Sequence, residues 1–133
     1  MARSVIKPIY LALILLLIIS ACSTVSGDQM ELTEEDAGKT IEMSKGGTLS
    51  IVLEGNPSTG YLWEVDSVEA RVLKPVGEAE FKPVSDAPGS GGKVKLQFEA
   101  VEPGETLLSL IYHRPWEQDV LPEENFEVTV VVK

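Results

Sequence analysis

Hydrophobic and polar side chains alternate with a period of two along most of the chain from Thr40 onward. This alternation is typical of strands with one buried face and one solvated face. The clearest case is Lys93–Ala100, because Val94, Leu96 and Phe98 fall on one face of the strand. The same pattern predicts strands at Thr48–Leu53, Tyr61–Val65, Thr106–Tyr112 and Asn125–Val132, with weaker candidates at Thr40–Met43 and Val72–Val76.

Glycine and proline separate these runs, as expected for residues that mark turns and loops. They lie at Gly46-Gly47, Gly55–Pro57, Pro83–Gly92, Pro103-Gly104, Pro115 and Pro122. About seven short strands with such breaks predict an all-β domain, an antiparallel β-sandwich with a barrel as the alternative. Trp63 and Phe98 are expected in its core. The only helical turn expected is at Thr33–Ala37, with Thr33 as its N-cap.

The N-terminal segment has a different pattern. Arg3 and Lys7 precede an uncharged apolar run, Ile9–Ile19. This arrangement is typical of a secretory signal, and the run is short for a membrane-spanning helix, which needs about 20 residues. Ile19–Cys22 (ISAC) resembles the bacterial lipobox, which implies cleavage before Cys22 and lipidation of that residue. An ordinary signal peptide and an uncleaved anchor helix remain alternatives.

The chain is therefore expected to have three parts: a signal peptide at 1–21, lipidated Cys22 with a polar tether to residue 37, and a folded domain at 38–133. The small polar residues of Ser23–Glu31 favour a short tether. Several acyl chains on Cys22 would anchor the domain stably to a membrane of the cell envelope. Under each alternative the folded part faces outside the cytoplasm, in the periplasm or at the cell surface.

The charge of the chain excludes some classes of partner. It has 11 Lys and Arg against 21 Asp and Glu, a net charge of −10. This acidic excess argues against nucleic-acid binding and against a polybasic grip on anionic lipid. The 44% hydrophobic content argues against a disordered acidic tail. With one Cys and one His, no intrachain disulfide, metal centre or cofactor is expected.

No convincing catalytic set is present, so an enzyme is not expected. Ser109 and His113 are close in sequence, but strand geometry would separate them by more than about 10 Å. Cys22 lies at the tether. A pair of glycosidase carboxylates cannot be chosen among the many acidic residues without a cleft.

Three loops are more informative than the strands. In Gly55–Gly60, Pro57 fixes its own φ, Asn56 can cap the bend, and Gly60 permits an angle that side chains disfavour. This segment is a stiff loop of small residues that could enter a narrow cleft, or simply a good hairpin turn.

The second loop, Pro83–Gly92, is long and rich in glycine, as functional or mobile loops often are. It does not fit a phosphate-binding loop, because a strand follows it and no Lys-Ser/Thr pair is present. The third loop, His113–Glu117, carries Arg114 and Trp116, residue types enriched at interface hot spots. Alternatively, Trp116 folds back over the sheet edge and Arg114 forms a surface ion pair.

Together these loops resemble the three signature motifs of the chagasin-like inhibitors of papain-family cysteine peptidases, in the family's order. The matching residues are Asn56, Pro57, Ser58, Thr59, Gly60 and Tyr61, then Gly89, Ser90, Gly91 and Gly92, then Arg114, Pro115 and Trp116. The resemblance covers roughly Thr40–Lys133. Ser58 stands where the family more often has threonine, and since it keeps the hydroxyl, at most a modest change in affinity or selectivity is expected.

The resemblance implies an immunoglobulin-like sandwich with the three loops at one end. Asn56–Gly60 would enter the active-site cleft of the peptidase, with Thr59 close to its catalytic cysteine. Trp116 would stack on the enzyme at one side, and Gly89–Gly92 would make backbone contacts at the other. Inhibition would be tight, competitive and reversible, by a monomer.

Two other functions fit the same composition. One is an immunoglobulin-like adhesion or assembly module of the cell envelope, which would use sheet edges or faces. The other is a carbohydrate-binding sandwich that stacks sugars on Trp63 or Trp116.

Overall fold

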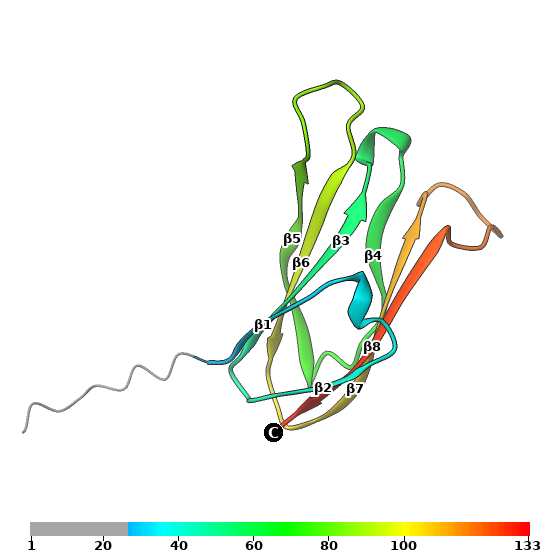
Figure 1. Cartoon of the computed structure of the whole chain (residues 1–133). Coiled ribbons are helices and arrows are strands. Elements are labelled where there is room, and N and C mark those ends of the chain that lie inside the picture. Colours follow the sequence, from blue (N-terminus) through cyan, green and yellow to red (C-terminus); the bar gives the residue numbers. More distant parts are fainter. Residues whose placement is uncertain (1–26) are drawn as a thin grey trace, which may run out of the picture.

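Residues 27–133, which the computed structural model describes, form two four-stranded β-sheets packed face to face (Figure 1). One sheet has the order β1-β3-β6-β5 and the other β2-β8-β7-β4. The strands are β1 (Gln29–Leu32), β2 (Thr40–Met43), β3 (Thr48–Gly55), β4 (Leu62–Ser67), β5 (Leu73–Pro83), β6 (Gly92–Ala100), β7 (Gly104–His113) and β8 (Glu124–Val132). Two short 3-10 helices, η1 (Glu34–Asp36) and η2 (Pro57–Thr59), lie between them.

The predicted all-β sandwich is confirmed, with eight strands in the described region instead of about seven. Two pairings depart from the expected antiparallel arrangement, because β1 pairs with β3 and β2 with β8 in parallel. The chain crosses from one sheet to the other between β1 and β2, so no hairpin forces these strands to be antiparallel. The remaining pairings are antiparallel.

The folded domain starts earlier than the expected residue 38. Gln29 pairs with Thr48, and Leu32 is buried, so part of the expected tether belongs to the sandwich. The predicted turn after Thr33 is present as η1, whose Asp36 carboxylate accepts a hydrogen bond from the Thr33 backbone N–H at 2.9 Å. The hydrogen bond from Lys39 and that from Thr33 lower the pKa of Asp36.

The weak candidate at Val72–Val76 is the start of a much longer strand. β5 continues to Pro83, after a register shift between Val76 and Glu80. Beyond Leu73, all side chains of β5 are exposed. A strand that buries neither face need not alternate apolar and polar residues. The alternation in the sequence therefore predicted only the first residues of β5.

The core lies between the two sheets and is made by the predicted faces. Leu49, Ile51 and Leu53 of β3 are completely buried, and Phe98 of β6 is 1% exposed. Trp63 is 4% exposed, and its indole N–H donates a hydrogen bond to the Glu54 carbonyl oxygen at 2.9 Å. A large buried aromatic ring thus lies at the end of the core where β3 leaves the sheet.

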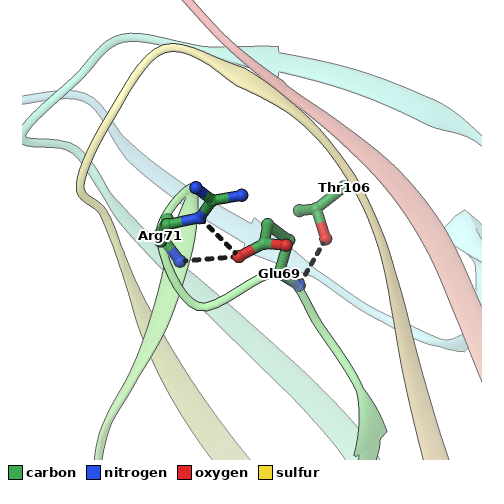
Figure 2. Close-up of polar contacts among 3 residues, drawn as sticks. All are labelled: Glu69, Arg71 and Thr106. Atoms are coloured by element: carbon green, nitrogen blue, oxygen red, sulfur yellow. Dashed lines mark hydrogen bonds and ion pairs between the residues drawn. The ribbon is translucent and has the colours of Figure 1, made fainter.

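At the other end, the β4–β5 turn is fastened to β7 by a buried hydroxyl (Figure 2). The Glu69 backbone N–H donates to Thr106 Oγ1 at 2.8 Å. The Glu69 carboxylate in turn accepts hydrogen bonds from the backbone N–H and Nε of Arg71, and these bonds lower its pKa. Thr106 is buried, so its polar group is used inside the protein.

Replacing Thr106 with valine should therefore lower the free energy of unfolding by about 1 kcal/mol, because the Glu69 N–H loses its acceptor. Urea denaturation would measure the change. An unchanged urea midpoint would mean that this hydrogen bond contributes nothing to stability.

No helix among residues 27–133 is long and apolar enough to cross a membrane. The predicted signal peptide and Cys22 fall within residues 1–26, outside the described part of the chain.

Candidate functional site

Three connections between strands lie together at the end of the sandwich opposite the C-terminus (Figure 1). The first loop is 56–61 between β3 and β4, the second is 84–91 between β5 and β6, and the third is 114–123 between β7 and β8. These loops contain nearly all of the residues of the three predicted motifs, and Gly92 is the first residue of β6. The expectation that the motifs share one end of the fold is met.

The first loop is held in shape by its own hydrogen bonds. Asn56 Oδ1 accepts from the backbone N–H and the hydroxyl of Ser58, at 3.2 and 2.6 Å. The Thr59 hydroxyl donates to the Asn56 carbonyl oxygen at 2.6 Å. Gly60 then ends η2 in the left-handed region, with φ of 84°. The hydroxyl that Ser58 shares with threonine is therefore one of the groups that hold the first loop in shape.

Asn56 also joins the first loop to the second. Its side-chain Nδ2 donates to the Gly89 carbonyl oxygen at 3.1 Å, while its backbone N–H donates to the Tyr112 hydroxyl at 2.9 Å. One residue thus connects the first loop, the second loop and strand β7. This contact explains why an asparagine, which has both an acceptor and donors, suits position 56.

Arg114 joins the third loop to the first. Its Nε donates to the Thr59 carbonyl oxygen at 3.1 Å, and its guanidinium carbon lies 4.4 Å from the centre of the Tyr61 ring. Its Nη1 forms an ion pair with Glu117 at 3.1 Å. The surface ion pair considered for Arg114 does exist, but the same side chain also holds the first loop.

Trp116 does not fold back over the sheet edge. It is 67% exposed, and its ring lies directly against Gly60, so that a Cβ at position 60 would overlap Cη2 of the indole. The absence of a side chain at Gly60 is what lets the two loops approach. A large aromatic surface consequently remains open to solvent beside the tip of the first loop.

Sequence reasoning missed two residues that support the site. Tyr112 stacks between Tyr61 and Trp63, with ring centroids 5.2 and 5.1 Å away, directly below the first loop. Its pairing with Trp63 across β4 and β7 could have been found only once the register of those strands was known. Glu117 was named only as the last residue of the third loop, although its spacing of three from Arg114 permits the observed ion pair.

Ser109 and His113, the two residues considered for catalysis from the sequence, both lie on β7. Ser109 is buried, and His113 Nε2 is engaged by the Glu64 carboxylate at 2.6 Å. Within residues 27–133 no group of three or more His, Cys, Asp and Glu side chains is placed to hold a metal ion. What the three loops offer is a protruding, internally braced surface with small residues in the middle and an exposed indole at one side.

Comparison with known proteins shows which family the sequence matches. Residues 42–130 match the family described as "Chagasin family peptidase inhibitor I42". Amoebiasin-1 of Entamoeba histolytica is 39% identical over 90 residues, which cover 65% of this chain and 84% of the relative.

Solved structures share the fold. The crystal structure of a cysteine protease inhibitor from Entamoeba histolytica superimposes with a TM-score of 0.70 at 26% identity, over 80% of this chain and 96% of that one. PbICP-C, solved in complex with falcipain-2, shares the fold with a TM-score of 0.52 at 21% identity, over 80% of this chain and 100% of that one. The implied immunoglobulin-like sandwich is thereby confirmed, and the chain belongs to the chagasin family of peptidase inhibitors.

Proposed function

We propose that the domain is a reversible, tight-binding inhibitor of papain-like cysteine peptidases and that its three loops occupy the active-site cleft. The observation that carries the proposal is that Asn56 and Arg114 tie the three motif segments into one surface. The Entamoeba histolytica relative of the same fold is itself a cysteine protease inhibitor.

The first loop is suited to block a cleft without being cleaved. The carbonyl oxygen of Thr59 accepts from Arg114 Nε, and that of Asn56 accepts from the backbone N–H and the hydroxyl of Thr59. Because these carbonyl oxygens already accept hydrogen bonds within the inhibitor, they are not free to enter the oxyanion hole of the peptidase, which cleavage of the peptide bond would require. With Thr59 close to the catalytic cysteine, the loop would exclude substrate and leave no acyl-enzyme behind.

Bracing of the loops should favour tight binding. A flexible loop loses conformational freedom when it binds, and this loss weakens the complex. Here the bonds around Asn56 and the contact of Arg114 with Tyr61 already restrict the loops in the free protein. Trp116 is left as a large exposed side chain available for burial against the enzyme.

Inhibition assays test the proposal directly. Residues 23–133 would be titrated against papain and several cathepsins, with a competitive pattern and full recovery of enzyme activity on dilution expected. No inhibition at micromolar concentration across these enzymes would exclude the proposed function.

A conservative substitution below the loop provides a finer test. In a Tyr112→Phe variant the aromatic stack remains, but the Asn56 N–H loses its acceptor. The inhibition constant should rise about fivefold, equivalent to a net hydrogen bond of about 1 kcal/mol. Steady-state inhibition kinetics would measure it, and an unchanged constant would show that Tyr112 does not position the first loop.

We also propose that the domain is lipid-anchored through Cys22 and faces outside the cytoplasm. The lipobox-like Ile19–Cys22 supports this. The first described strand begins with the pairing of Gln29 with Thr48, at the far end of β3 from the first loop. A domain anchored from that end would direct its loops away from the membrane. Metabolic labelling with palmitate should label the wild type and not the Cys22→Ser variant. Labelling that persists in Cys22→Ser, or that is absent from the wild type, would contradict the lipid anchor.

The carbohydrate-binding alternative loses one of its two candidate platforms. Trp63 is buried in the core and its N–H is bonded to Glu54, so it offers no face for a sugar ring.

A further inference from the structure

The third loop carries a second exposed apolar group beyond its Arg114–Trp116 motif. Val120 is 59% exposed and Leu121 is 89% exposed, on the same loop as Trp116. Neither residue belongs to the three motifs, and neither contributes to the core. Apolar side chains gathered on a protruding surface point to a binding role more strongly than apolar side chains scattered singly.

Both sides of this group are fastened to the framework. On one side, Arg114 and Glu117 are joined by an ion pair and by a backbone hydrogen bond of 3.1 Å. On the other, the Glu123 N–H donates to the Tyr112 carbonyl oxygen at 2.8 Å. The segment between Glu117 and Glu123 therefore projects from two fixed points.

The apolar pair adjoins the three-loop surface. Val120 and Leu121 line a small hollow of about 50 Å³ together with Tyr61 and Arg114. Tyr61 belongs to the first loop, and Arg114 holds the carbonyl group of Thr59. A partner that covers the three motifs would meet Val120 and Leu121 at the edge of the same contact area.

Acidic residues surround the pair. Residues 117–124 contain Glu117, Asp119, Glu123 and Glu124, and no Lys or Arg. Glu117 is paired with Arg114, whereas Asp119, Glu123 and Glu124 form no ion pair with the rest of the described chain. The pair is therefore an apolar patch with an acidic rim.

We infer that Val120 and Leu121 are a second anchor for the peptidase and determine which peptidases are inhibited most strongly. This inference rests on the proposed function. The matching surface would be an apolar wall beside the active-site cleft that carries lysine or arginine side chains. Apolar contacts buried at the interface slow dissociation, and the acidic rim speeds association with a basic wall.

The apolar contribution is tested with the double variant Val120→Ser/Leu121→Ser. For a papain-like peptidase with a basic wall beside its cleft, the inhibition constant should rise about tenfold or more, mainly through faster dissociation. Leu107→Ser is the matched control, because Leu107 is 51% exposed on β7, outside the three loops. A control within about twofold of wild type is expected.

The acidic rim is tested with the double variant Asp119→Asn/Glu123→Gln. Its control is Glu102→Gln/Glu105→Gln, which removes the same charge at the opposite end of the domain. The first pair should slow association several-fold at low salt and much less at high salt, and the second pair should have little effect.

The outcomes are distinguishable. If wild type inhibits and Val120→Ser/Leu121→Ser inhibits equally well, the second anchor is excluded while the proposed function stands. Equal effects of the two charge-removing pairs would exclude the specific acidic rim. If wild type inhibits no papain-like peptidase, both the proposed function and this inference fail.

Discussion

Replacing Gly60 with alanine should weaken inhibition by about two orders of magnitude. Gly60 has φ of 84°, a conformation that costs an alanine about 1–2 kcal/mol. The new methyl group would also overlap the ring of Trp116. In the free inhibitor the first loop and Trp116 would move apart to relieve both problems. Binding would then have to restore their arrangement, at a combined cost of about 3 kcal/mol.

Gly46 provides a matched control for this substitution. Its φ of 86° is nearly the same, but nothing lies within 4 Å of a Cβ built there, and it belongs to the β2–β3 turn at the other end. Gly46→Ala should lower the free energy of unfolding by the same backbone cost of about 1–2 kcal/mol and leave the inhibition constant unchanged. Comparing the two variants by urea denaturation and inhibition kinetics separates backbone strain from loss of the loop contact.

A double variant identifies the cause more closely. If alanine at position 60 acts mainly by displacing Trp116, it should matter much less in a chain that already carries Trp116→Ala. Fully additive effects would contradict the role assigned to the contact between the first and third loops.

The strands could be predicted from the sequence wherever one face is buried. Leu49, Ile51 and Leu53 alternate with more exposed residues because they face the opposite sheet. The same reasoning failed for the second half of β5, which buries neither face, and for β1, because Gln29–Leu32 follows small polar residues and was assigned with them to the tether. Pairing direction at the two edges depends on how the chain crosses between sheets, which local alternation does not encode.

The site could be predicted only as three separate segments. Asn56, Gly60 and Arg114 were identified by residue type and by their resemblance to family motifs. Their contacts join residues 33 and 55 positions apart, and such contacts depend on how the two sheets bring the loops together. Tyr112 could not be predicted for the same reason. In the sequence it resembles any other apolar residue of its strand, and only the fold shows that its hydroxyl group accepts a hydrogen bond from the Asn56 N–H.

Truncating Trp116 to alanine should raise the inhibition constant about 30-fold or more, equivalent to about 2 kcal/mol, as expected for an aromatic hot spot. The indole is 67% exposed in the free protein, so little of its surface is already buried by folding. Its position is nevertheless restricted by contact with Gly60 on the first loop. An exposed ring that is already held in place gains apolar burial on binding and loses little freedom.

The stability of the same variant makes the result interpretable. Because most of the ring of Trp116 is in solvent, Trp116→Ala should change the free energy of unfolding by no more than about 0.5 kcal/mol, in contrast to truncation of the buried Trp63. Trp116→Phe, which keeps a smaller aromatic face, should fall between wild type and alanine in affinity. If Trp116→Ala is folded and inhibits papain-like peptidases as strongly as wild type, then the exposed indole is not an anchor. The binding energy would then have to come from the first and second loops alone.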